Sequence, residues 1–412
     1  MLKIGLTGGI ASGKSLAAAR LQELGALLVD SDVLARQVVE PGTPGLESVV
    51  QAFGGGVLQP NGQLDRPKLG AIVFQEPSKR AVLNSIIHPL VREAAGAIMA
   101  KAGPGDIVVQ DIPLLVETGQ GDNFHLVLVV DAPDDVRVRR MVELRGMTAE
   151  DARSRMAAQA ARSDRMAAAD VVLFNTGSKD DLLDTIDDLW RQRLQPFALN
   201  LRDGIRADRG AGVVLCPARP EWAQQADRLA SRILAAVGGD GLAVDHIGST
   251  AVPGLASKDV LDLQLVVADM TVADRIAPLL SAAGFPAVAG VLQDTPKPSH
   301  PDTGQWQKRF HANADPGRAV NLHVRSVGSP GWRFALQFRD WLRAEPGAVL
   351  LYEAHKQELA QLYADDTDAT AYAEAKEPWF TNVAWPLVEE WAARSGWQPP
   401  SYSTSADGKS GR

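Results

Sequence analysis

Residues 8–15 form a complete G-x-x-x-x-G-K-S pattern and read Gly8-Gly9-Ile10-Ala11-Ser12-Gly13-Lys14-Ser15. The pattern follows an apolar run at 2–6 and precedes a helix-forming stretch, which is the context that a phosphate-binding loop requires. Glycines allow the tight curve, so the N–H groups of residues 9–14 can point at phosphates near a helix N-terminus. We therefore predict that residues 8–15 bind ATP or GTP, with Lys14 reaching the β- and γ-phosphates and Ser15 ligating Mg²⁺.

The strands expected around this loop indicate the fold class. Apolar stretches at 3–7, 26–30, 107–111, 126–131 and 171–174 alternate with helical patterns. This alternation predicts an α/β fold of the P-loop NTPase type, with a doubly wound parallel sheet. Asp30, Asp111 and Asp131 close three of the strands, and ligands bind outside the carboxyl ends of such strands. We interpret Asp131, which precedes Ala-Pro-Asp-Asp, as a turn or helix-cap residue.

Length, charge and composition narrow the class of protein. The chain has 412 residues, enough for two or three domains, and a formal net charge of −8 without a long basic block. Neither a nucleic-acid partner nor a membrane partner is therefore expected, and protein partners cannot be inferred. The single Cys216 suits a reducing compartment, and because residues 1–3 run directly into the strand before the loop, no signal peptide is expected. We predict a cytoplasmic enzyme.

An arginine-rich segment at 137–165 distinguishes between classes of nucleotide-binding protein. A regulatory GTPase would need an Asn-Lys-x-Asp motif, and no Asn in the chain is followed by Lys. Arg155, Gln159 and Arg162 recur at helical spacing, after a capping box that begins at Thr148. This pattern favours a helical lid that closes over phosphates in a kinase, although a solvated helix face gives the same pattern.

Phosphoryl transfer requires a base near the attacking hydroxyl and cations near the phosphates. Asp32 lies just beyond a predicted strand, where it can accept the hydroxyl proton. Lys14 and Arg140 are the candidates for charge stabilisation, and Arg145 competes with Arg140 for the role of catalytic lid arginine. Asp111 is a second candidate for holding Mg²⁺, through water.

The first 195 or so residues resemble the dephospho-CoA kinase family. The matching segments are, in order, 4–15, 30–36, 64–70, 87–92, 111–117, 140–159 and 169–177. The resemblance implies that the ribose 3′-hydroxyl of dephospho-CoA attacks the γ-phosphate of MgATP, which yields CoA and ADP. It also implies that His88, Leu114 and Leu115 surround the acceptor and that Asn175 lies beside the adenine. A kinase of another small hydroxyl acceptor, such as a nucleoside or nucleotide, remains the alternative.

The second half of the chain has a different pattern. We predict a kinase domain at 1–197, a linker at 198–212, an α+β domain at 213–397 and a disordered tail at 398–412. Strands are expected at 242–247, 259–267 and 319–324, and helices at 332–344 and 350–363.

Segments 245–258, 338–343 and 372–376 resemble the GrpB-like family, which implies a nucleotidyltransferase-like fold. Members of that fold hold two metals with an Asp-x-Asp pair, but here the strand reads Asp262-Leu263-Gln264. A neutral amide has little value for a second Mg²⁺, so this half is predicted to be non-catalytic and to assist folding or stability, or else to bind a ligand. His246 and His323 are interpreted as structural residues.

Overall fold

The computed structural model describes residues 1–210, 212–365 and 370–402. The contacts divide the chain into two compact units, Met1–Trp190 and Arg191–Arg412. Each unit has its own sheet and its own buried core, as expected for a chain of this length. The two units are described separately.

The first unit is built on a five-stranded sheet within residues 1–190, all of which are described, with the order β2-β3-β1-β4-β5. Every neighbouring pair is parallel, so the predicted doubly wound α/β fold is confirmed. The five predicted strands are also confirmed, with small differences at their ends. They are β1 (Leu2–Gly8), β2 (Leu27–Asp30), β3 (Ile107–Asp111), β4 (Leu126–Asp131) and β5 (Val171–Phe174).

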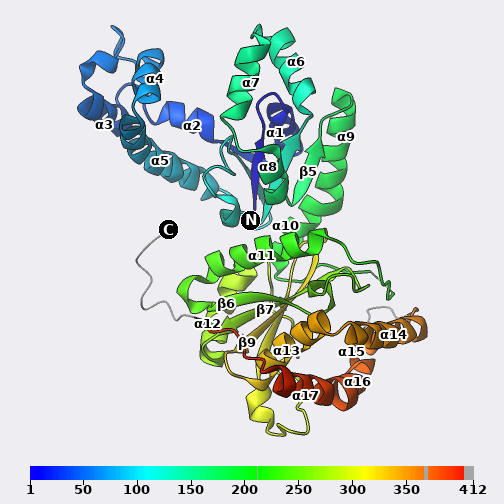
Figure 1. The fold of residues 1–412 in the computed structure, drawn as a ribbon. Helices are drawn as coiled ribbons and strands as arrows, with labels where there is room; N and C mark the ends of the chain where they lie inside the picture. Colours follow the sequence, from blue (N-terminus) through cyan, green and yellow to red (C-terminus); the bar gives the residue numbers. More distant parts are fainter. Residues whose placement is uncertain (211, 366–369, 403–412) are drawn as a thin grey trace. The chain divides into compact units, whose positions relative to one another are not determined.

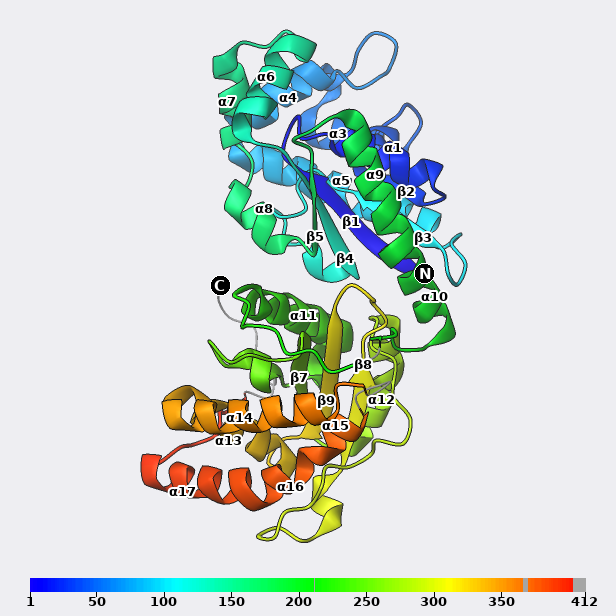
Figure 2. The ribbon, with the colours of Figure 1, turned by 90° about the vertical axis from the view of Figure 1, so that its right-hand side faces the viewer.

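The helices of the first unit fall into three groups. α1 and α9 pack together on one side of the sheet, and α8 lies on the other (Figure 2). α3, α4 and the outer end of α5 form a separate bundle, well away from the α6 and α7 pair (Figure 1). The bounds are α1 (Lys14–Glu23), α2 (Ser31–Gln37), α3 (Pro44–Phe53), α4 (Arg66–Gln75), α5 (Pro77–Met99), α6 (Asp134–Arg145), α7 (Ala149–Ala157), α8 (Arg162–Ala168) and α9 (Lys179–Leu189).

In its described part, the second unit contains a four-stranded mixed sheet with the order β6-β7-β9-β8. Only β7 and β9 run parallel; the other two pairs are antiparallel. Three of the strands match the expected ones, but β8 was missed, because it is short and begins with two charged residues, Lys308 and Arg309. The bounds are β6 (Ala243–Ile247), β7 (Val260–Val267), β8 (Lys308–Ala312) and β9 (Ala319–Ser326).

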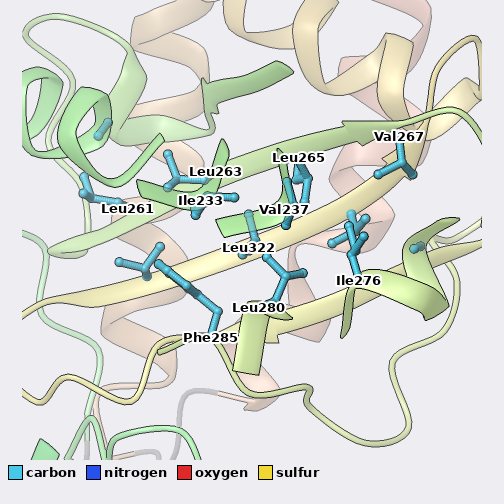
Figure 3. Packing of buried hydrophobic residues seen from close by; sticks show 14 of the residues in the cluster. Ile233, Val237, Leu261, Leu263, Leu265, Val267, Ile276, Leu280, Phe285 and Leu322 are labelled. Atoms are coloured by element: carbon cyan, nitrogen blue, oxygen red, sulfur yellow. The ribbon is translucent and has the colours of Figure 1, made fainter. Parts of the chain in front are cut away.

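Alternation along β7 separates an apolar face from a polar face. Leu261, Leu263 and Leu265 are fully buried and point toward the helices on one side of the sheet (Figure 3). They pack with Ile233 of α11 (Glu221–Val237) and Ile276 of α12 (Met270–Ala282). Residues 262 and 264 consequently face the opposite side, because successive side chains of a strand point in opposite directions.

The remaining helices of the second unit cover that opposite side. α13 (Pro330–Ala344), α14 (Pro346–Leu362), α16 (Glu377–Trp379) and α17 (Trp385–Ser395) share an aromatic core around Phe338. α15 (Thr370–Ala375) packs in a smaller cluster, with its Tyr372 against Leu359 of α14. The predicted helices at 332–344 and 350–363 correspond to α13 and α14. In the described ranges, no helix of either unit is both long and apolar enough to cross a bilayer.

The predicted linker and tail have more structure than their composition indicated. Residues 198–203 belong to α10 (Gln195–Asp203), and Asn200 donates a hydrogen bond to the Ala314 carbonyl at 2.9 Å. Ala207 is buried and donates to the Asn313 carbonyl at 3.0 Å. Of the predicted tail, 403–412 lies outside the described residues. Tyr402 donates to Asp245 at 2.8 Å, so order extends further than expected.

Candidate active site

The loop at residues 8–15 leaves β1 and enters α1 as the sequence pattern predicts. Gly13, at φ 105°, caps the helix in a left-handed conformation that glycine adopts without strain. Ala11 is also left-handed, at φ 61°, which is uncommon for a residue with a side chain. The first N–H groups of α1 have no partner within the helix, so they form an anion-binding end.

Three consecutive carbonyl groups of the loop are held from outside. Arg137 Nε donates to the Ile10 oxygen at 2.8 Å. Arg140, one helical turn further along α6, lies 3.4 Å from the Ala11 oxygen and 3.5 Å from the Ser12 oxygen. Asn175 donates to the Ser12 oxygen at 2.7 Å and accepts from Arg140 at 3.2 Å. Arg140 and Asn175 therefore lie against the loop, and the polar contacts of the Asn175 side chain are with the loop and with Arg140.

Lys14 meets a carboxylate at the end of the neighbouring strand. Its ammonium donates to Asp111 Oδ1, and both side chains are largely buried. Burial raises the pKa of the Asp111 carboxyl, the Lys14 ammonium opposes this rise, and the negative charges of Asp30 and Asp32 add to it. Lys14, Asp111 and two further carboxylates thus share one end of the sheet.

Asp30 and Asp32 have different environments. Asp30 caps α2, accepting from the backbone of Asp32 at 2.9 Å and of Val33 at 3.0 Å. Asp32 lies in the exposed first turn of that helix. Because Asp30 and Asp111 are register partners across β2 and β3, Asp32 follows immediately beyond the strand end at which Lys14 lies.

Ser15 and Asp111 supply the kind of oxygen atoms that Mg²⁺ prefers. Ser15 is exposed on the first turn of α1, next to Lys14. A hydroxyl and a carboxylate beside a phosphate-binding loop fit a cation that keeps several waters and also binds substrate phosphates. Among the described residues, no group of three or more His, Cys, Asp or Glu side chains forms a complete metal cage.

The other predicted site residues differ in their exposure. Arg145 is exposed at the end of α6. His88 is exposed on α5, beside the helical Pro89. Leu114 is 48 % exposed, whereas Leu115 is 1 % exposed and packs in the core beneath β1. Of the two leucines, only Leu114 is exposed.

The structure corrects two details of the predicted lid. α7 ends at Ala157, so Gln159 and Arg162 do not continue one helical face with Arg155. Asp131 is not a cap: it is 2 % exposed and accepts from Arg162 Nε at 3.0 Å and Nη2 at 2.6 Å. The strand end thereby anchors α8. The second error arises because the contact between Arg162 and Asp131 joins residues that are far apart in the sequence.

A pocket of about 1010 Å³ lies between α6, α7 and α8. Its lining carries more arginines than acidic residues, which suits an anionic ligand. The arginines are Arg137, Arg139, Arg153, Arg162 and Arg165.

Three residues that the sequence did not assign to the site connect the lid to the loop and to the segment after β3. Gln159 Oε1 accepts from the Ile10 N–H at 2.8 Å, and Arg137 is 2 % exposed behind the loop. Glu117 accepts from the Ala160 N–H at 2.7 Å. The pair Arg137 and Arg140, one turn apart, was the available signal, because it places two cations on one helix face.

The second unit has its own polar cluster, but its charges are paired internally. Gln264 is fully buried, and its Oε1 accepts from Arg325 at 2.8 Å. Arg325 also makes two bonds to Asp294, at 2.7 and 2.9 Å, and Lys308 reaches Asp294 at 2.6 Å. Gln264 therefore lies at the position where a nucleotidyltransferase-like fold would need a second carboxylate. Its side-chain oxygen is hydrogen-bonded to the guanidinium of Arg325.

Asp262, the remaining carboxylate of the expected pair, is similarly engaged. Asn321 donates to it at 2.8 Å, and His323 Nε2 lies 3.9 Å away. Burial alone would raise the pKa of the Asp262 carboxyl, but His323, Asn321 and the charge of Lys376 lower it. Burial lowers the pKa of His323 to about 4, and the Arg325 charge adds to this shift.

The parallel sheet, the phosphate-binding loop and the arginine-bearing lid define the first unit as a P-loop kinase. A family model matches each half of the chain. The model described as "Dephospho-CoA kinase" matches residues 2–181, and the model described as "GrpB protein" matches residues 212–384. A dephospho-CoA kinase from Mycobacterium tuberculosis is 47% identical over 412 residues, covering 97% of this chain and 100% of that protein. The chain belongs to the dephospho-CoA kinase family.

Other relatives match only the first half. A dephospho-CoA kinase from Streptomyces avermitilis is 52% identical over 190 residues, which is 46% of this chain and 93% of that protein. Among solved structures, a dephospho-CoA kinase from Campylobacter jejuni is 23% identical with a TM-score of 0.38, covering 46% of this chain and 96% of that one.

Proposed function

We propose that the first unit transfers the γ-phosphoryl group of ATP to the ribose 3′-hydroxyl of dephospho-CoA, giving CoA and ADP. The observation that carries this assignment is the meeting of Lys14 with Asp111 at the strand end that Asp32 also borders. Phosphoryl transfer is catalysed chiefly by positioning and by charge stabilisation, which this arrangement supplies. Family membership supports dephospho-CoA as the acceptor.

Each polar group then has a distinct role. Apart from the Ile10 and Ser12 N–H groups, which donate to Gln159 and to the Gly9 carbonyl, the loop N–H groups bind the phosphates. Lys14 exchanges Asp111 for a phosphate oxygen when ATP binds. Asp32 accepts the proton of the attacking hydroxyl, and its exposure leaves it open to an acceptor. Arg140 stabilises charge that develops during transfer, with Arg145 as the competing candidate.

Mg²⁺ fits the donor set of this site. Ser15 would hold it directly, and Asp111 through water. The ion would neutralise charge on the β- and γ-phosphates. His88 and Leu114 are assigned to the acceptor side and Asn175 to the nucleotide side, as the family resemblance implies; Leu115 supports them from the core.

We propose that the second unit is non-catalytic and assists the folding or stability of the chain. Its fold would need two carboxylates to organise two metals, and the second position is an amide bound to Arg325. The Streptomyces avermitilis relative matches only the first half of this chain, and it is also named a dephospho-CoA kinase. This is consistent with chemistry in the first unit. A ligand-binding module is the alternative. The domain limits, the cytoplasmic location and the lack of a nucleic-acid partner stay predictions.

An acceptor panel tests the proposed activity. ADP release by the full chain would be measured with MgATP and, in turn, dephospho-CoA, nucleosides, nucleoside monophosphates and shikimate. We expect turnover with dephospho-CoA alone, and a product whose new phosphate is on the 3′-oxygen by mass spectrometry and ³¹P NMR. Turnover of a nucleoside or nucleotide, with none of dephospho-CoA, would favour the alternative kinase.

A further inference from the structure

Ile10 is held on both of its polar backbone groups by two side chains that also bind each other. Its N–H donates to Gln159 Oε1 at 2.8 Å, and its carbonyl accepts from Arg137 Nε at 2.8 Å. Arg137 Nη2 closes the set by donating to Gln159 Oε1 at 3.3 Å. We refer to Ile10, Arg137 and Gln159 as the loop clamp.

The packing around Arg137 indicates that the surrounding structure is shaped to accommodate the loop clamp. The residue is 2 % exposed, and its Nη1 donates to Asp134 at 3.1 Å. A Cβ atom on Gly9 would lie 2.5 Å from Arg137 Nη2, so a glycine is what lets the guanidinium reach Ile10. A buried guanidinium is costly unless it is hydrogen-bonded, and here each of its three nitrogens has a partner.

The clamp also connects the loop to the base of the lid. Gln159 lies just beyond the end of α7, and the adjacent Ala160 is tied through its N–H to Glu117, in the segment that follows β3. The Ile10 N–H is directed at Gln159, while the Ile10 carbonyl is turned outward toward Arg137. The conformation of the loop is thereby fixed by a residue of the lid.

We propose that Arg137 and Gln159 are positioning residues that hold the phosphate-binding loop in its nucleotide-binding shape and couple that shape to the docking of the lid. They act through Ile10. Loss of Arg137 or Gln159 should therefore weaken the binding of ATP and leave the binding of dephospho-CoA unchanged. This inference rests on the proposed kinase activity.

The test replaces the Gln159 oxygen in the full chain. Gln159→Met keeps the length of the side chain and removes its acceptor, which leaves the Ile10 N–H unpaired. We expect the KM for ATP to rise on the order of tenfold, with the KM for dephospho-CoA unchanged. Gln159→Glu, which keeps an acceptor oxygen, should recover most of the loss. Gln22→Met, at an exposed glutamine of α1, is the matched control.

A double variant tests whether the two residues act as a unit. Arg137→Lys with Gln159→Met should cost no more than the worse single change, since either change breaks the clamp. Native ATP kinetics in Gln159→Met, fully additive losses, or equal losses for both substrates with a lowered Tm would each overturn the proposal. If Gln159→Met fails to fold, Gln159→Asn, whose amide is too short to reach Ile10, serves in its place.

A separate binding measurement distinguishes failure of the clamp from failure of the proposed function. MgATP binding to the native chain and to Gln159→Met would be titrated calorimetrically without acceptor. A weaker Kd in the variant supports the clamp even if dephospho-CoA is not the acceptor, whereas identical Kd values contradict it.

Discussion

Both units place a carboxylate on a sheet strand beside cationic or polar groups, but the two arrangements differ in what their charges can do. Asp111 faces Lys14, a lysine that belongs to a phosphate-binding loop and can exchange its partner. Asp262 faces Asn321 and His323, while Gln264 is fixed by Arg325. An active site needs charges that a substrate can recruit. In the second unit, Asp262 and Gln264 are hydrogen-bonded by the protein's own side chains, which suits a structural role.

The largest effect is expected at Lys14 and Asp32. Lys14→Ala removes the phosphate-binding ammonium and Asp32→Asn removes the base, so each should lower kcat by roughly 10²-fold or more. Steady-state ADP release with dephospho-CoA measures both variants, and circular dichroism checks the fold. Asp65→Asn, at a carboxylate that caps α4, is a control. Near-normal kcat in Asp32→Asn would remove it from the role of base.

A smaller loss is expected at Arg140. Its guanidinium stabilises charge that develops during transfer, so Arg140→Ala should lower kcat by roughly tenfold to a hundredfold and weaken ATP binding less. The matched variant is Arg145→Ala, at an exposed position on the same helix. ATP Kd and kcat would be measured together. A large loss of affinity at unchanged kcat would place Arg140 in ground-state binding and favour Arg145 as the catalytic arginine.

The second unit should be sensitive to acid through His323. Its pKa of about 4 in the folded chain lies below the ordinary 6.5, so the unfolded chain binds the proton first as pH falls. The contribution of His323 to stability should be constant above about pH 7 and decline between pH 6.5 and 4, by on the order of 1–3 kcal/mol.

His323→Asn is expected to flatten this decline. Thermal unfolding of the full chain, followed from pH 7.5 to 4.5, measures the difference. His88→Asn, at an exposed histidine of the first unit, provides the comparison. Parallel pH profiles for native and His323→Asn chains would show that another group controls the acid response.

The sequence was sufficient for features encoded over short distances. The loop and its flanking strands follow from glycine spacing and from apolar runs, and the Gln264 substitution is visible in one tripeptide. Long-range pairings were not predictable in the same way. Arg162 meets Asp131 and Gln159 meets Ile10 only after the sheet has assembled. β8 was missed because Lys308 and Arg309 bind acidic side chains from elsewhere in the unit, which a local pattern does not reveal.

The smallest effect on kcat is expected for a substitution of Asp262, the carboxylate of the second unit that we compare with Asp111. Asp262→Asn in the full chain removes the remaining carboxylate of the second unit's expected metal pair and keeps the size of the side chain. We predict that kcat for dephospho-CoA phosphorylation stays within about twofold of the native value, because no transfer chemistry depends on that group. A loss of tenfold or more, in a variant with native circular dichroism and native Tm, would show that the second unit takes part in catalysis.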